Sequence, residues 1–320
     1  MNRRIGVCLT AALLAIPTLG SGFDMSRHGV PVDQIVSGGP RKDGIPALHA
    51  PRLVDAAGAT FLHPSDRVIG VSIGAAARVY PINILNWHEA VNDTLGGEPI
   101  VVTYCPLTDS AVVFDRRVNG QLYEFRVSGL LYESNVLLYD RQTESLWSQL
   151  AGQAVTGEMN GAGMRSLASA VTSWADWQRA HPHTTVVSFD TGYRRDYAYD
   201  SYEDYRLEAE PIFPVSRSDK RLPDKERVLG LRLGEESRAY PLAQLARVGR
   251  IEETVSGTAV TVTYDRASDR ASVTDAASGR QIPATTVYWF AWAAFYPKTS
   301  LWSSGVASTA DRTKLPRGGP

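Results

Sequence analysis

Apolar and polar residues alternate in the same way along two separate stretches of the chain. In the first stretch, mostly β-branched runs over 68–73 and 78–82 are separated by a glycine-containing turn, which predicts a strand hairpin. An apolar segment over 84–91 predicts a short helix, and a further β-branched run follows it. That run is expected to end as a strand at Cys105, because Pro106 cannot donate a hydrogen bond to a sheet.

A second hairpin is predicted soon after Cys105. Residues 111–118 and 121–127 have the pattern of strands, and the Asn119-Gly120 pair between them is typical of a two-residue hairpin turn. Short strands joined by tight turns, with few helical segments, predict an α+β fold that is predominantly antiparallel β-sheet.

The pattern of the first stretch returns 160 residues later. Residues 66–105 align with residues 226–265 without a gap, and 13 of the 40 aligned positions are identical. Residues 177–184 and 292–299 also resemble each other, but with an offset of 115, so the first stretch carries an insert of about 45 residues. We therefore predict an internal duplication of one β-rich unit.

These patterns divide the chain into six segments. We expect a signal peptide over 1–22, an extended lead-in over 23–65, a first unit over 66–190 with an insert at about 128–172, a tyrosine-rich linker over 191–225, a second and shorter unit over 226–302, and a disordered tail over 303–320.

The N-terminus indicates export. Arg3 and Arg4 precede an apolar run over 5–19 that is too short to span a membrane stably, and small residues follow it. We expect a periplasmic or extracellular protein from which Cys8 is removed with the signal, leaving no transmembrane segment. The net charge of −1 gives no electrostatic reason to expect a nucleic-acid partner, whereas a protein or small-molecule ligand stays open.

Cys105 is then the only cysteine of the mature chain. A single cysteine in an oxidising compartment is a functional thiol, an intermolecular link or a buried filler. The second unit has Asp265 at the position of Cys105 and Val248 at the position of His88. Because the predicted helix leads directly into the strand of Cys105, we expect His88 and the thiol to lie close together, in the first unit alone.

A thiol beside an imidazole supports three kinds of chemistry. His88 can activate Cys105 as a nucleophile, the two can bind a soft metal such as copper or zinc, or the thiol can undergo redox exchange. Glu89, Asp109 and Arg141 are candidates for supporting this site or contacting a substrate. The alternative is a non-catalytic envelope or extracellular binding module, in which Cys105 is packing and the insert and the tyrosines of 193–205 form the contact surface.

Five motifs lie within the first unit: N-W-H-E-A-V-N-D at 86–93, T-Y-C-P-L at 103–107, V-F-D-R at 113–116, S-G-L-L-Y at 128–132 and Y-D-R-Q-T-E-S-L-W at 139–147. Together they resemble a bacterial exported family catalogued as domain of unknown function 3179, over about residues 50–300. The family pattern implies C-P-L-C at the strand end, whereas Thr108 stands at the second cysteine position here. This departure argues against a dithiol couple or a two-cysteine metal clamp, and leaves a one-thiol site or one that has lost its activity.

Overall fold

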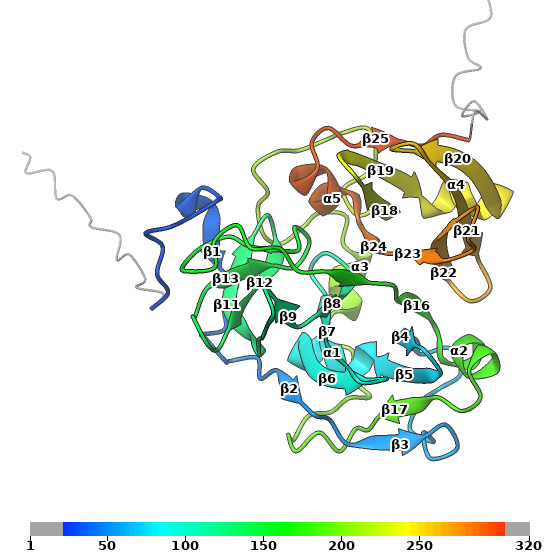
Figure 1. Ribbon diagram of the computed structural model, residues 1–320, viewed down its shortest axis with the longest axis horizontal. Helices are drawn as coiled ribbons and strands as arrows, with labels where there is room; N and C mark the ends of the chain where they lie inside the picture. The colour runs from blue at the N-terminus through cyan, green and yellow to red at the C-terminus, as the bar shows by residue number, and fades with distance from the viewer. Residues whose placement is uncertain (1–21, 305–320) are drawn as a thin grey trace, which may run out of the picture.

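The computed structural model describes residues 22–304, which form a mostly antiparallel β structure with few short helices. The five larger sheets are arranged in a propeller-like ring (Figure 1). The predicted α+β fold with predominantly antiparallel sheet is therefore confirmed at this level. The expected signal peptide, with Cys8, and almost all of the expected tail lie outside the described residues. Among the helices of residues 22–304, none combines the length and apolar character needed to cross a bilayer.

Three of the sheets belong to the first half of the chain. The first has the order β16 (Ala170–Ser173), β4 (Arg67–Ile73), β5 (Ala76–Pro81), β17 (Thr185–Val187) and β3 (Leu53–Asp55). The second has the order β15 (Ser166–Leu167), β8 (Ser110–Asp115), β7 (Glu98–Cys105), β6 (Ala90–Leu95) and β2 (Leu48–His49). The third has the order β1 (Ile35–Ser37), β11 (Phe125–Tyr132), β12 (Asn135–Asp140), β13 (Leu146–Ser148) and β14 (Gln153–Ala154).

Smaller elements complete this half. They are a two-stranded hairpin of β9 (Arg117–Val118) and β10 (Gln121–Leu122), a 3₁₀ turn η1 (Val32–Gln34), and the helices α1 (Ile82–His88), α2 (Trp174–Ala180) and α3 (Glu203–Leu207). Asn119 and Gly120 both have positive φ at the tip of the β9–β10 hairpin, as the predicted turn requires. The predicted pairing of 111–118 with 121–127 is otherwise wrong, because β8 pairs with β7 and β11 pairs with β12.

Two four-stranded sheets form the second half. One has the order β24 (Ala284–Tyr288), β18 (Arg227–Leu233), β19 (Glu236–Pro241) and β25 (Ser300–Leu301), and the other is β20 (Arg250–Val255), β21 (Thr258–Asp265), β22 (Arg270–Asp275) and β23 (Gln281–Ile282). The helices are α4 (Leu242–Val248) and α5 (Trp289–Phe295).

The element order β4-β5-α1-β6-β7-β8 recurs as β18-β19-α4-β20-β21-β22, and every element bound is displaced by 160 residues. Helix α5 follows α2 with an offset of 115. The packing recurs as well, because Gly70 lies against the indole of Trp177 and Gly230 lies against that of Trp292 so closely that a Cβ on either glycine would collide with the ring. The two units therefore share one local architecture.

The predicted helix over 84–91 is wrong at both ends. It begins at Ile82 and ends at His88, because Glu89 adopts a left-handed conformation with φ of 55°. Residues 90–95 instead form β6, which pairs with β7 across a turn at Gly96 and Gly97. Five of the six residues of β6 are buried, so the strand lacks the alternation by which a half-exposed strand is recognised.

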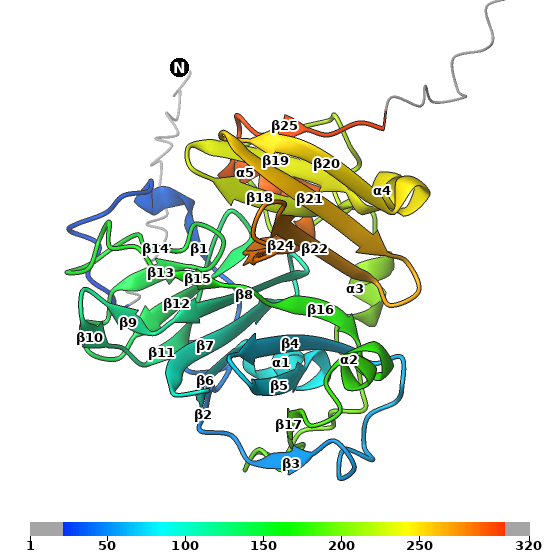
Figure 2. The same ribbon diagram turned by 45° about the vertical axis from the view of Figure 1, so that its right-hand side comes forward.

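The two units meet through strands that contact each other reciprocally. Strand β24 of the second unit packs on β8 of the first, and β16 of the first unit packs on β22 of the second. The amide of Tyr288 donates to the carbonyl of Thr108 over 2.8 Å, and the amide of Ser173 donates to the carbonyl of Ser268 over 3.1 Å. Figure 2 shows these four strands in the centre of the molecule, between the units.

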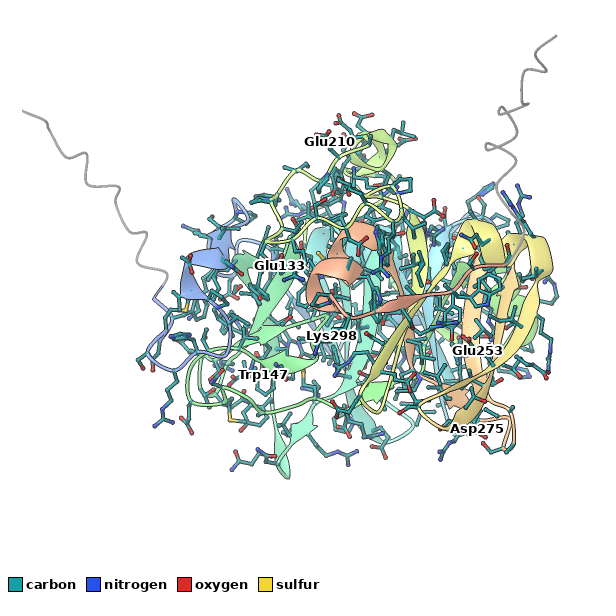
Figure 3. The ribbon with its side chains drawn as sticks, turned by 90° about the horizontal axis from the view of Figure 1, so that it is seen from above. Glu133, Trp147, Glu210, Glu253, Asp275 and Lys298 are labelled. Atoms are coloured by element: carbon teal, nitrogen blue, oxygen red, sulfur yellow. The ribbon has the colours of Figure 1, made fainter. Side chains whose placement is uncertain are left out.

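The insert adds the sheet around β12 and β13 to the first unit. The β12–β13 hairpin is joined by a turn at residues 141–145. Its motif is architectural, because the buried carboxylate of Asp140 accepts the indole N–H of Trp147 over 2.8 Å and the amide of Thr143 over 2.6 Å. Figure 3 shows Trp147 of the insert at one side of the molecule and Glu253 of the second unit at the other.

Candidate functional site

The tyrosine-rich segment between the units crosses the C-terminal end of α1. We call residues 193–207, which include α3, the strap. Each of three consecutive residues at the end of α1 meets a different strap side chain. The pairs are Asn86 Nδ2 with Asp200 Oδ1 at 3.1 Å, the Trp87 ring with the Arg195 guanidinium at 5.7 Å, and His88 Nε2 with the Tyr197 hydroxyl at 2.7 Å. The strap therefore covers the N-W-H motif.

Both ring nitrogens of His88 are engaged. Nδ1 lies 2.7 Å from the carbonyl oxygen of Pro46, which can only accept, so Nδ1 carries the proton. Burial lowers the pKa of His88, so the ring is neutral and Nε2 accepts a hydrogen bond from the hydroxyl of Tyr197. The lone pair that would take a proton from a thiol is therefore occupied, and His88 holds the strap.

Cys105 lies at the end of β7, as predicted, but its thiol is sealed in the interior with 1% exposure. Burial, and after it the charge of the nearby Glu89 carboxyl, raises the pKa of Cys105 to about 11. The thiol is thus protonated at neutral pH. Among residues 22–304 no hydrogen bond joins Cys105 to His88, whose two ring nitrogens bond to Pro46 and Tyr197 instead.

Glu89 is the titratable side chain that the structure places near the thiol. The residue is 6% exposed, its carboxyl has no hydrogen-bond partner among residues 22–304, and burial raises its pKa to about 8. Its backbone caps α1, because its amide donates to Leu85 and its carbonyl accepts from Tyr104, each over 2.8 Å.

The second unit makes the same cap without a side chain. Gly249 takes the position of Glu89 with φ of 70°, donates to Leu245 over 2.7 Å and accepts from Tyr264 over 2.9 Å. Glycine is the residue that adopts this conformation without strain. The cap itself therefore does not require Glu89, and the first unit bears backbone strain and a buried carboxyl at this point.

The strap completes the surroundings of this pair. Burial raises the pKa of Tyr202, and the charges of Glu89 and Cys105 raise it further, so all three groups lie within electrostatic reach of one another. Tyr205 donates from its hydroxyl to the carbonyl of Leu107 over 2.7 Å, which fastens α3 to the turn that follows Cys105. The thiol of Cys105 and the carboxyl of Glu89 thus lie close to the phenol of Tyr202, which belongs to the strap.

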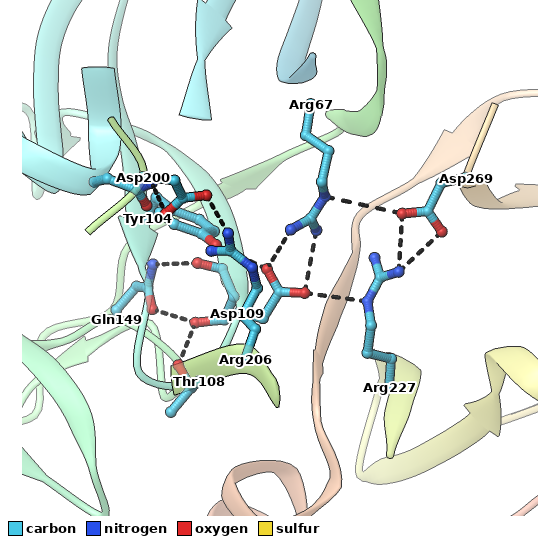
Figure 4. Close-up of polar contacts among 11 residues, drawn as sticks. Arg67, Tyr104, Thr108, Asp109, Gln149, Asp200, Arg206, Arg227 and Asp269 are labelled. Atoms are coloured by element: carbon cyan, nitrogen blue, oxygen red, sulfur yellow. Dashed lines mark hydrogen bonds and ion pairs between the residues drawn. The ribbon is translucent and has the colours of Figure 1, made fainter. Parts of the chain in front are cut away.

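Asp109 lies elsewhere, in a cluster of charges between the units (Figure 4). Its buried carboxylate accepts from Arg67 over 2.9 and 3.1 Å and from the Tyr104 hydroxyl over 2.8 Å, and it lies 3.1 Å from Nε of Arg227. Burial alone would raise the pKa of Asp109, but the two guanidinium groups outweigh it and lower the pKa. Asp109 therefore joins the two units.

Arg141 also lies apart from the thiol. It sits on the β12–β13 turn with 65% of its side chain exposed, and its guanidinium pairs with Glu124 at 3.8 Å. The described residues contain no group of three or more histidine, cysteine, aspartate or glutamate side chains placed to hold a metal ion. The expected copper or zinc site thus finds no complete ligand set there.

The comparison with known families is decisive for classification. The sequence profile of the family described as a protein of unknown function (DUF3179) matches residues 42–299. The chain belongs to the DUF3179 family. No curated protein and no solved structure matches it. Membership of DUF3179 brings no activity with it, so the chemistry of this member depends on its own site.

In this DUF3179 protein the sequence favoured Cys105 and His88 as the centre of the site. It named Glu89 only as a supporting group and did not name Tyr202. A signal for Glu89 was present in the alignment of the two units, because a glutamate opposite a glycine at a helix end indicates a positive φ that glutamate disfavours. No pattern in the sequence indicated which face of the strap would lie on α1.

Proposed function

We propose that this DUF3179 protein is an exported protein with a single thiol-centred site in its first unit, in which Cys105 exchanges disulfides and Glu89 carries the proton. The observation that supports this proposal is the buried, unpartnered carboxyl of Glu89 on a strained backbone beside the thiol, where the second unit has glycine. Strain and a strongly shifted pKa are typical of functional positions.

The proposed step is thiol–disulfide exchange with a disulfide substrate. The sulfur of Cys105 attacks one sulfur of the substrate, the substrate S–S bond breaks, and a mixed disulfide forms. Glu89 delivers its proton to the departing thiolate and takes the proton that Cys105 releases, so the products are the mixed disulfide and one free thiol. A pKa of about 8 suits a group that must both give and accept a proton near neutral pH.

The strap controls access in this proposal. Cys105 is almost fully buried, and the pKa of about 11 keeps its thiol protonated while the strap is closed. Displacement of Tyr202 and Tyr205 would admit water and substrate to the turn after β7. His88 acts as a positioning residue, because it holds Tyr197 of the strap.

The second candidate function is a non-catalytic binding module of the cell envelope or medium. It is favoured by the sealing of Cys105, which lies in the large apolar cluster together with Phe114, Trp147 and Trp289. In this alternative the thiol fills space, and the insert and the strap carry the binding surface.

We also propose that the two units arose by duplication. The shared order of elements, the constant sequence offsets and the equivalent glycine–tryptophan contacts support this proposal.

The two candidates are separated by two reagents applied to the full mature protein. Both reagents need an accessible Cys105 that can lose its proton, but only oxidised glutathione has an alkyl thiolate leaving group that benefits from an acid. We expect native Cys105 to react with both reagents, and the ratio of the glutathione rate to the iodoacetamide rate to fall as the pH rises through 8 and Glu89 loses its proton.

In the Glu89→Gln variant we expect the glutathione reaction at pH 7 to be at least roughly a hundredfold slower, with a much smaller change in the iodoacetamide rate. Mass spectrometry of the adducts measures both rates, and Cys105→Ser is the blank. A thiol that reacts with neither reagent until urea unfolds the protein would instead support the binding module.

A further inference from the structure

A crevice of about 450 Å³ lies between the insert and the second unit, at a different place from the thiol. One wall is formed by β8 and by residues 149–153 and 163–169, and the other by β18, β24 and α5. Its volume falls within the range of small-molecule sites in proteins. The second unit has no counterpart of the insert, so the part of the lining at residues 149–153 and 163–169 belongs to the first unit alone.

The lining of the crevice is amphipathic. Leu167, Leu233 and Ile282 provide partly exposed apolar surface, and the hydroxyl of Tyr296 donates to the carbonyl of Leu150 over 2.6 Å. Phe114 and Trp292 also line the crevice but are almost fully buried. Such a lining accommodates a compact apolar body by burial of its surface. The aromatic side chains are held by their own contacts, so the apolar part of the site is already formed.

Arg232 is the one charged side chain of the lining. Its Nη1 donates to the carbonyl of Ala151 over 3.3 Å, and its guanidinium lies 5.1 Å from the centre of the Tyr296 ring. Among the described residues it forms no ion pair, although a guanidinium has five N–H donors. The first unit has Ser72 at the equivalent position, so the shared fold does not require this cation.

We propose that the crevice binds an amphipathic organic anion, with a carboxylate on the guanidinium of Arg232 and an apolar body against Leu167, Leu233 and Ile282. Charge complementarity supports the anion, because a carboxylate pairs with the fork of a guanidinium through two hydrogen bonds. The apolar lining supports the body of the ligand. This site is independent of the thiol chemistry proposed above.

The test is calorimetric titration of the full mature protein with decanoate and with decanol, which share an apolar chain and differ in charge. We expect saturable binding of decanoate and weaker binding of decanol. In Arg232→Gln the affinity for decanoate should fall roughly tenfold or more, while that for decanol stays unchanged. Arg232→Lys should retain part of the preference for decanoate.

Two controls isolate the crevice. Arg217→Gln removes an exposed arginine outside it and should leave both affinities unchanged, as should Cys105→Ser, which removes the thiol. The proposal is overturned if both probes bind equally well, if Arg232→Gln leaves the affinity for decanoate unchanged, or if decanoate shows no saturable binding up to about 1 mM. Failure of the thiol chemistry would leave these results unaffected.

Discussion

At position 89, two structurally equivalent residues of one chain solve the same backbone problem differently. Gly249 ends α4 without strain, whereas Glu89 ends α1 in a conformation that costs an L-residue about 1–2 kcal/mol. The carboxyl is buried as well, so its charged form is disfavoured. Backbone strain and carboxyl burial at Glu89 therefore both lower the free energy of unfolding, and both occur beside the only cysteine of the described residues.

Glu89 should make the free energy of unfolding depend on pH. The pKa of Glu89 is about 8 in the folded protein and 4.5 as a model value, so the folded state binds the proton more tightly. Its contribution is complete below pH 4.5 and is lost as the pH rises through 8, at about 1.4 kcal/mol per pKa unit. Glu89→Gln should remove this loss, so its advantage over the wild type in urea unfolding should grow between pH 5 and pH 9.

Glu89→Gly separates strain from charge in the same experiment. It removes both, whereas Glu89→Gln keeps the left-handed strain, so glycine should exceed glutamine by about 1 kcal/mol at every pH. Parallel pH profiles for the wild type and Glu89→Gln would contradict the raised pKa. A glycine variant less stable than the glutamine variant would show that the side chain contributes packing that outweighs the strain.

Among the elements, the strap stands out because it has little internal structure. Its one helix, α3, has five residues, too few to be stable by itself, so the strap depends on its contacts with α1 and the turn after β7. Segments of this kind open locally at a lower free energy than the core unfolds. Access to Cys105 should therefore follow the opening of the strap.

The element-scale prediction is that Asp200→Ala speeds the alkylation of native Cys105. The carboxylate of Asp200 accepts from the side-chain amide of Asn86 in α1 over 3.1 Å and from the backbone amide of Tyr202 over 3.0 Å. It also pairs with Arg206, so its removal loosens the strap at three points. We expect a rate increase of roughly tenfold, measured with iodoacetamide under native conditions.

Asp196→Ala is the matched control for the strap. This aspartate is exposed and accepts only from the amide of Ala198, within the strap itself, so the alkylation rate should be unchanged. If Asp200→Ala changed the rate only in proportion to its effect on global unfolding in urea, access to Cys105 would depend on global unfolding and not on the strap.

In the whole molecule, the two units are joined by a charge cluster that is built from equivalent residues of each unit. Arg67 and Arg227 occupy equivalent positions, as do Asp109 and Asp269, and each aspartate lies close to both arginines (Figure 4). The equivalence ends at burial, because the side chain of Asp109 is 2% exposed and that of Asp269 is 30% exposed.

Removing the charge of either aspartate should lower the free energy of unfolding, but by different amounts. Asp109→Asn should destabilise the protein by about 3 kcal/mol or more, because it leaves two guanidinium groups without a buried countercharge. Asp269→Asn should cost about 1 kcal/mol or less, since its pairs are partly solvated. Urea unfolding at pH 7 measures both, and similar losses for the two variants would contradict the argument from burial.

The same comparison has a pH dependence with a definite sign. The pKa of Asp109 is lowered from its model value of 3.8, so its stabilising contribution is present above pH 3.8 and is lost as the pH falls through the folded-state pKa. The difference between the wild type and Asp109→Asn should therefore shrink in acid. A difference that persists below this range would indicate a loss of packing and not of charge.

The sequence by itself determined the local architecture. Glycine-containing turns, β-branched runs and the Asn119-Gly120 pair predicted the strands and hairpins, because turn geometry and strand patterning depend on neighbouring residues. The same local rules, applied to residues 66–105 and 226–265, showed that the two stretches share a pattern. The position of Cys105 at a strand end was likewise a local inference.

The tertiary structure decided which groups meet. The strap occupies His88, so the imidazole is engaged by Tyr197 and Pro46, and Glu89 is the group left near the thiol. The crevice around Arg232 also exists only because the insert packs beside the second unit. These contacts join residues far apart in the chain, and burial then sets their pKa values. Neither the contacts nor the pKa values could therefore be deduced from local sequence.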